Sequence, residues 1–214
     1  MNNQFWSAIF ISLYASTAAT VLCTIIGIPL GCGLALSHFK GKHLTLSLLN
    51  TLLSFPTVVV GLIVYLLICR NSVLGGLHLL FTPEAIIFGE FILALPIMVV
   101  FSHSAVASID PTARETAILL GVNAPRLFLM LISEARLGII AAIAATFGRL
   151  IGEVGVAMML GGNIAGYTRT MTTTIALEAS KGEVLLGLQL GGVLLLLAVV
   201  VNLLLRYLQG KSAP

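Results

Sequence analysis

The chain has 214 residues, of which 58% are hydrophobic and 9% are charged, and its formal net charge is +3. A soluble domain carries about 25% charged residues, so the composition excludes a soluble globular protein and predicts a single membrane domain over residues 1–214. The small, scattered charge argues against nucleic-acid binding, and the three cysteines lie in apolar runs without metal-ligand or redox spacing.

Five apolar stretches are long enough to cross a membrane as helices. A helix needs about 20 apolar residues to span the hydrocarbon, and backbone polar groups in lipid must be satisfied within the segment. In chain order, the predicted spans cover residues 8–36, 44–69, 85–107, 137–160 and 184–208. The sequence therefore predicts an all-α integral membrane protein, a bundle of five spans.

Prolines and glycine pairs occur inside these spans. Pro29, Pro56 and Pro96 lie within or near the middle of the first three. Pairs with Gly-x-x-x-Gly spacing are Gly27/Gly31, Gly148/Gly152 and Gly187/Gly191. Small residues allow close helix packing in lipid, so we expect ordinary bundle contacts. Alternatively, the prolines create movable half-helices around a transport pathway; the two interpretations are compatible.

The distribution of lysine and arginine predicts the orientation. Seven lie in the segments 37–43 and 108–136 or near the C-terminus: Lys40, Lys42, Arg114, Arg126, Arg136, Arg206 and Lys211. The opposite side has three: Arg70, Arg169 and Lys181. Because basic residues concentrate on the cytoplasmic side, we expect a multi-pass inner-membrane protein with its N-terminus outside and its C-terminus in the cytoplasm.

Segment 108–136, between the third and fourth spans, has the pattern of a helix-turn-helix. Asp110 and Pro111 are typical of a helix N-cap and first position, and Gly121 is placed to end that helix. Asn123 begins a second helix, which we expect to continue into the fourth span. The segment contains more apolar residues than a solvated loop needs, which predicts a protein partner on the cytoplasmic side.

Within this segment, Glu115-Thr116-Ala117, followed after three residues by Gly121, resembles the EAA-x3-G signature of permease subunits in binding-protein-dependent ABC importers. Thr116 departs from the consensus alanine, and Leu131-Ile132-Ser133-Glu134 replaces the usual ending. The resemblance implies a type I importer fold in which this segment is the coupling helix that docks into an ATPase. The implied coupling residues are Glu115, Thr116, Ala117, Gly121, Arg126 and Glu134.

Downstream stretches resemble tungstate-type permeases, which are close to the molybdate type. They are Glu134-Ala135-Arg136, Phe147-Gly148-Arg149, Glu153-Val154-Gly155 and Gly161-Gly162-Asn163-Ile164. The resemblance implies import of an oxyanion by two permease copies, two ATPase chains and an extracytoplasmic binding protein. ATP and Mg²⁺ would be used by the ATPase, with no cofactor on this chain. Tungstate and molybdate both remain open as substrates.

Ionisable residues inside the spans are candidates for function because they are costly in lipid. Arg149 and Glu153 are spaced i,i+4 and can form an ion pair on one helical face. This pair either neutralises itself and fixes packing, or Arg149 contacts a transported dianion while Glu153 limits how tightly it is held. Glu90 and His103, in the third span, are interpreted as structural.

The segment 161–183 is rich in glycine and threonine and is predicted on the outer side. Thr168 and Thr170 flank Arg169 and follow Asn163. Hydroxyls and a cation suit a desolvated oxyanion, so we expect a gate or a surface under the binding protein. The alternative is a polar, solvated loop with a helical tail.

Motifs for catalysis are not expected in this chain. Gly210-Lys211-Ser212 ends like a nucleotide-binding loop, but Leu205 stands where its first glycine is required. No metal-ligand or hydrolase signature accompanies it, so we predict a non-catalytic subunit with no metal site. A self-contained secondary transporter or channel is the alternative, although such proteins usually contain internal repeats.

Overall fold

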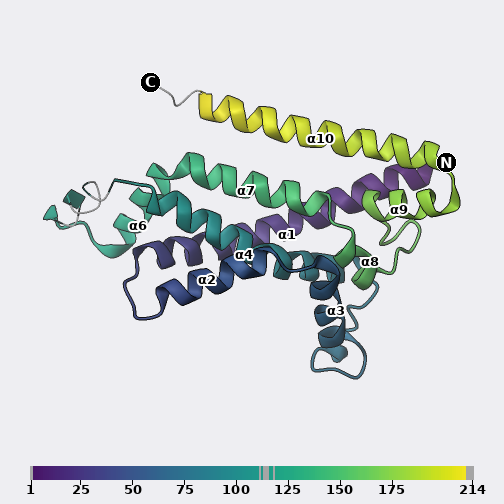
Figure 1. Ribbon diagram of the computed structural model, residues 1–214, viewed down its shortest axis with the longest axis horizontal. Helices are drawn as coiled ribbons and strands as arrows, with labels where there is room; N and C mark the ends of the chain where they lie inside the picture. Colours follow the sequence, from purple (N-terminus) through teal and green to yellow (C-terminus); the bar gives the residue numbers. More distant parts are fainter. Residues whose placement is uncertain (1, 111, 113–115, 118, 211–214) are drawn as a thin grey trace.

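A computed structural model describes residues 2–110, 112, 116–117 and 119–210. In this part of the chain, every regular element is a helix (Figure 1). The elements are α1 (Asn2–Leu36), α2 (Lys42–Leu53), α3 (Thr57–Ile68), η1 (Gly75–Leu77), α4 (Pro83–Ala107), α6 (Ala124–Glu134), α7 (Arg136–Ile151), α8 (Gly155–Gly161), α9 (Met171–Lys181) and α10 (Val184–Gly210).

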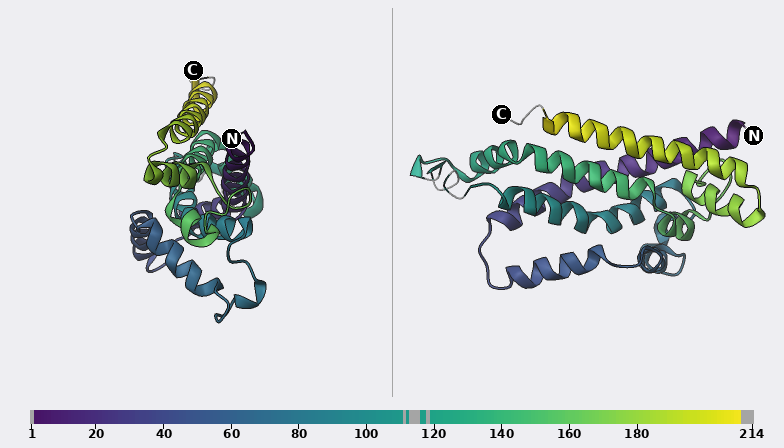
Figure 2. Two further views of the ribbon diagram at one scale, coloured as in Figure 1. Left: turned by 90° about the vertical axis from the view of Figure 1, so that its right-hand side faces the viewer. Right: turned by 45° about the horizontal axis from the view of Figure 1, so that its top comes forward.

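The long helices form an elongated bundle with two distinct ends. Helices α1, α4 and α7 make up its centre, and α10 runs along its outside (Figure 1). Helix α6 lies at one end of the bundle, whereas α8 and α9 lie at the other, as Figure 1 and the right-hand view of Figure 2 show. We refer to these as the α6 end and the α9 end.

Three helices, α1, α4 and α10, are individually long and apolar enough to cross a membrane, and the number rises to five if each of two bent helix pairs is one span. The pairs are α2 with α3, bent by 101°, and Pro125–Glu134 with Arg136–Ile151, bent by 73°. The composition and these helices agree with a multi-pass membrane bundle.

Two predicted spans are not continuous helices. Residues 44–69 are divided at Pro56, which caps α3; proline lacks an N–H and cannot continue the backbone ladder of α2. Residues 137–160 are divided after Ile151, where Gly152 caps α7 and α8 starts at Gly155. Pro29 and Pro96, in contrast, lie inside the uninterrupted helices α1 and α4.

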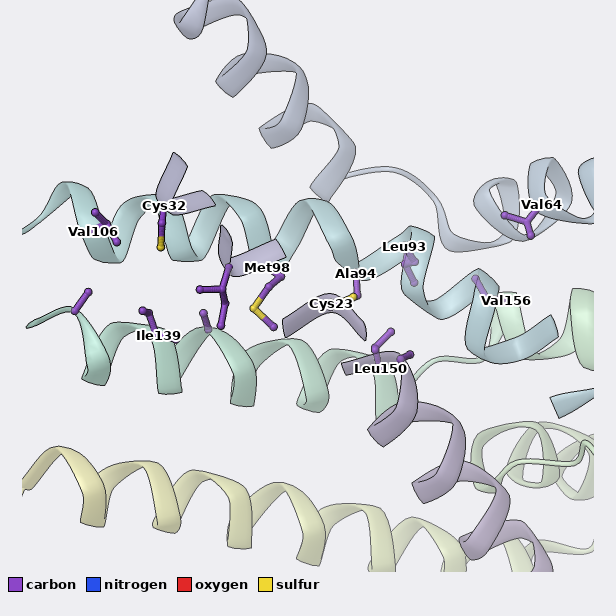
Figure 3. Packing of buried hydrophobic residues seen from close by; sticks show 14 of the residues in the cluster. Cys23, Cys32, Val64, Leu93, Ala94, Met98, Val106, Ile139, Leu150 and Val156 are labelled. Carbon is purple, nitrogen blue, oxygen red and sulfur yellow. The ribbon is translucent and has the colours of Figure 1, made fainter. Parts of the chain in front are cut away.

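Helices α1 and α4 pack closely because glycine faces α4. A Cβ added to Gly31 would lie 2.5 Å from the carbonyl oxygen of Val99, and one on Gly27 would lie 2.7 Å from Cγ of Met98. Met98 and Leu150 bring α4 and α7 together in the buried cluster that Figure 3 shows. The predicted close packing is confirmed for this glycine pair.

The other two glycine pairs do not make the expected contacts within the described chain. A Cβ on Gly148 or Gly191 would meet no described atom within 4 Å, and one on Gly152 would approach only the Gly148 carbonyl. Gly187 is close to Ile175 at 3.9 Å, an ordinary van der Waals distance. Gly148 instead lines a pocket between α7 and α10, together with Leu197 and Val201 of α10.

Candidate functional site

The predicted helix-turn-helix lies at the α6 end. The Asp110 carboxylate accepts a hydrogen bond from the Thr112 backbone N–H at 3.0 Å, and bonding from Thr112 holds the pKa of Asp110 below its usual value. Gly121 has φ of +76°, and the Val122 N–H bonds to the Ala117 carbonyl at 3.1 Å. These contacts are those of a capped helix start and a glycine-terminated helix end, as predicted.

The second helix of this segment begins as expected but ends sooner. Asn123 caps α6 by accepting the Arg126 N–H. However, α6 ends at Glu134, and α7 departs at 73° after the single residue Ala135. The expectation that this helix continues straight into the fourth span is wrong, because the buried Ala135 packs into the core at the turn.

The implied coupling residues occupy different environments. Thr116, Gly121, Arg126 and Glu134 are exposed, whereas Ala117 is buried against the core. Glu115 lies outside the described residues. Leu119 and Leu120 are 86% and 78% exposed, so the tip of the segment presents large apolar side chains outward.

Arg149 and Glu153 form an ion pair, as their spacing predicts. Arg149 Nη1 lies 2.7 Å from Glu153 Oε2. The pair does not lie on one continuous helix, however: α7 ends at Ile151, and Glu153 occupies the break before α8. Glu153 Oε1 also accepts the Val156 N–H at 3.2 Å, and its backbone carbonyl accepts the Thr172 hydroxyl at 2.6 Å. Glu153 thus stabilises the break through three separate contacts.

The two partners differ in exposure. The side chain of Arg149 is 42% exposed, whereas that of Glu153 is 2% exposed. The exposed residues around Arg149 on α7 and at its end are small: Ala145, Gly148 and Gly152. We call this surface the Arg149 face. Part of the Arg149 side chain is accessible there from outside the chain.

The loop between α8 and α9 is held in shape by its own polar groups. Arg169 Nε donates to Asn163 Oδ1 at 3.1 Å, and Nη2 donates to the Asn163 carbonyl at 3.2 Å. Asn163 has φ of 52°, a left-handed conformation that asparagine tolerates. The Thr168 hydroxyl donates to the Gly161 carbonyl at 2.5 Å and accepts the Ile164 N–H.

The threonines of α9 are buried and hydrogen-bonded. Thr170 and Thr173 form a capping box at its N-terminus, and the Met171 N–H donates to the Ser12 hydroxyl of α1 at 2.8 Å. The segment thus combines an exposed loop, with residues 162 and 164–167 open to the outside, and a helix whose threonines are buried. The Thr168 and Thr170 hydroxyls, expected as donors for an oxyanion, already have partners within the chain.

The Thr172 contact gives a direct test of how the break is stabilised. Because Thr172→Val removes the hydroxyl donated to Glu153, we expect a loss of about 1 kcal/mol of stability, visible as a lower Tm of the purified protein. Thr24→Val is the matched control, since the Thr24 hydroxyl donates to the Thr20 carbonyl within α1. Equal Tm values for the two variants would contradict the role given to Thr172.

Sequence reasoning missed the polar residues of α1. Ser12, Ser16 and Thr20 are buried at i,i+4 spacing, and Ser12 bonds to α9. The sequence did indicate a buried polar face here, because these three hydroxyl residues share one face of a span that has no charged residue. The end of α7 and the break before α8, which hold Arg149 and Glu153, lie toward the α9 end with the 162–170 loop, whereas the described coupling residues lie at the α6 end (Figure 1).

Comparison with known proteins identifies the family. Residues 27–213 match the family described as the binding-protein-dependent transport system inner membrane component. The chain belongs to this family. As such a permease subunit, it is a multi-pass inner-membrane protein, and membership implies a binding protein and an ATPase as partners.

Individual relatives cover nearly the whole permease. It is 43% identical over 199 residues to the probable anion ABC transporter permease protein of Haloferax volcanii, covering 91% of this chain and 86% of the relative. It is 41% identical over 203 residues to the tungstate uptake system permease protein TupB of Campylobacter jejuni, covering 95% and 85%.

A solved structure shares the fold. A chain of the MetNI methionine ABC transporter, in inward facing conformations, superposes with a TM-score of 0.79, covering 97% of this chain and 95% of that chain at 16% identity. The predicted architecture, an importer-type permease bundle, is confirmed.

Proposed function

We propose that this permease imports tungstate, or the closely similar molybdate, from an extracytoplasmic binding protein, with ATP hydrolysis in a separate subunit as the energy source. The names of the Haloferax and Campylobacter relatives support an oxyanion substrate. Their similarity favours an importer subunit over a self-contained secondary transporter or channel.

The observation that carries this proposal is the partly exposed side chain of Arg149. A cation that faced hydrocarbon would be costly, so the Arg149 face points to a polar space, which we assign to the translocation pathway. A dianion is the natural ligand for such a cation. Glu153 competes with it for Arg149 and prevents binding so tight that release would be slow.

We assign Asn163, Thr168, Arg169 and Thr170 to the gate at the outer side. Because their polar groups are hydrogen-bonded within the chain, their role is to fix the shape of the loop while Ile164 and Tyr167 remain exposed at its tip. This tip is the surface that we expect to meet the binding protein.

We assign the α6 end of the bundle as the surface that binds the ATPase. The charge distribution of the sequence favours a cytoplasmic α6 end, with the N-terminus outside and the C-terminus inside. The exposed Leu119 and Leu120 suit a cleft in an ATPase subunit. Two copies of the permease then pair with two ATPase chains, and nucleotide binding shifts the pair between outward- and inward-open states.

Reconstitution tests the proposal. We expect the permease to purify with its ATPase in equal amounts, and expect tungstate-loaded binding protein to stimulate ATP hydrolysis in liposomes. Binding protein without anion is the control, and methionine is the control for substrate class. Uptake of tungstate without an ATPase, or ATP hydrolysis insensitive to the anion, would contradict the assignment.

A further inference from the structure

The carboxyl group of Glu90 is buried inside the bundle and only partly hydrogen-bonded. Glu90 lies in α4 and is 2% exposed. Ser16 of α1 hydrogen-bonds to its carboxyl. Its Oε2 has no hydrogen-bond partner in the part of the chain that the structure describes. A buried carboxylate without a cation is very costly, whereas the neutral acid has an O–H that can donate a hydrogen bond.

A second carboxyl group approaches the same region from the break between α7 and α8. Val156 donates its N–H to Glu153 Oε1, and its Cγ1 would lie 2.6 Å from a Cβ on Gly89, the neighbour of Glu90. Glu153 and Glu90 interact electrostatically. Cys23 of α1 is the other titratable group that interacts with Glu90 among the described residues. Glu90 therefore faces no described cation, whereas Glu153 has Arg149.

We propose that Glu90 is a protonated acid that donates a hydrogen bond to Glu153 when Arg149 leaves Glu153 for the transported anion. This inference rests on the proposed function, in which Arg149 contacts the oxyanion. While the ion pair is closed, Glu90 bonds to Ser16. When the guanidinium rotates to the anion, Glu153 becomes an unpaired buried carboxylate.

The hydrogen bond from Glu90 lowers the cost of that unpaired state. The proton stays on Glu90, so no bond to hydrogen is broken and no proton crosses the membrane with the anion. Glu90 is thus a positioning residue, which acts on the anion only through Glu153 and Arg149. Its effect falls on the rate of transport rather than on the affinity of the binding protein.

Infrared spectroscopy of the reconstituted complex tests the protonation state. We expect a carbonyl stretching band from a protonated carboxyl at neutral pH, and expect Glu90→Gln to remove it. Glu178→Gln is the matched control: Glu178 is also buried but is paired with Lys181 at 2.9 Å, so the band should persist. A band that survives in Glu90→Gln would overturn the proposal.

The hydrogen bond itself is tested by the position of this band. In Arg149→Gln, Glu153 has no ion-pair partner, so the Glu90 band should shift even without anion. An unshifted band in that variant would overturn the proposal. In the unmodified complex, tungstate should produce the same shift. The Glu90 band could instead shift in Arg149→Gln but not when tungstate is added to the unmodified complex. That result would refute the contact between Arg149 and the anion, while the hydrogen bond between Glu90 and Glu153 would stand.

Uptake measurements provide an independent readout. We expect Glu90→Leu to lower kcat about tenfold with little change in KM, since a buried charged group loses its donor. Glu90→Gln, whose amide can donate to Glu153, should recover most of that loss. Equal rates for Glu90→Leu and the unmodified complex would count against the proposal. If Glu90→Leu fails to assemble, the infrared comparison decides.

Discussion

Replacing Arg149 with glutamine is expected to lower tungstate uptake by roughly 10- to 100-fold, the factor that corresponds to losing one charge-assisted hydrogen bond to the anion. The complex should still assemble, because the Arg149 side chain is 42% exposed and fills little space within the chain. Uptake into liposomes and co-purification of the ATPase measure the two effects separately.

A double variant distinguishes an anion contact from simple charge neutralisation. Arg149→Gln leaves Glu153 buried without its partner, which by itself destabilises the break between α7 and α8. Combining it with Glu153→Gln removes both charges. If Arg149 only neutralises Glu153, the double variant should regain uptake. If Arg149 contacts the anion, uptake should stay low while stability returns, and this second outcome is the one that we expect.

Substitution of Gly121 should separate ATP hydrolysis from transport. Gly121 ends its helix with φ of +76°, a conformation in which a β-branched residue is strained. Gly121→Val should therefore displace the exposed Leu119 and Leu120 and abolish most uptake while membrane insertion stays normal. The ratio of anion transported to ATP hydrolysed measures the effect.

The matched control for this position is Gly121→Asn. Asparagine tolerates the left-handed region because its side chain can hydrogen-bond locally, so this variant should retain most uptake. A Cβ at Gly121 would meet no described atom within 4 Å, so steric crowding within the chain does not account for a difference between the two. Normal coupling in Gly121→Val would mean that the ATPase binds elsewhere.

Local chemistry made parts of this structure predictable. Gly121 and Asn123 were recognisable as helix boundaries because a positive φ and an N-cap require particular residue types. The i,i+4 spacing of Arg149 and Glu153 predicted their ion pair. In these cases, the residues that determine the geometry are neighbours in sequence.

Contacts between distant segments were not predictable in this way. The Ser12–Met171 and Thr172–Glu153 hydrogen bonds join residues 159 and 19 positions apart. In a membrane bundle, both the interior and the lipid-facing surface are apolar, so hydrophobic periodicity does not indicate which face is buried. The break after Ile151 was not predicted for the same reason, because the residues on either side of it are mostly apolar apart from Arg149 and Glu153.

The turn at Ala135 has a mechanical consequence. Helices α6 and α7 are joined by this one residue, and backbone hydrogen bonds continue on both sides of it, from Ala135 to Leu131 and from Ile139 to Ala135. No compliant linker separates them. Arg149 lies 13 residues beyond Arg136, about 20 Å along the helix axis. If a bound subunit moves α6, α7 would therefore move with it and shift Arg149.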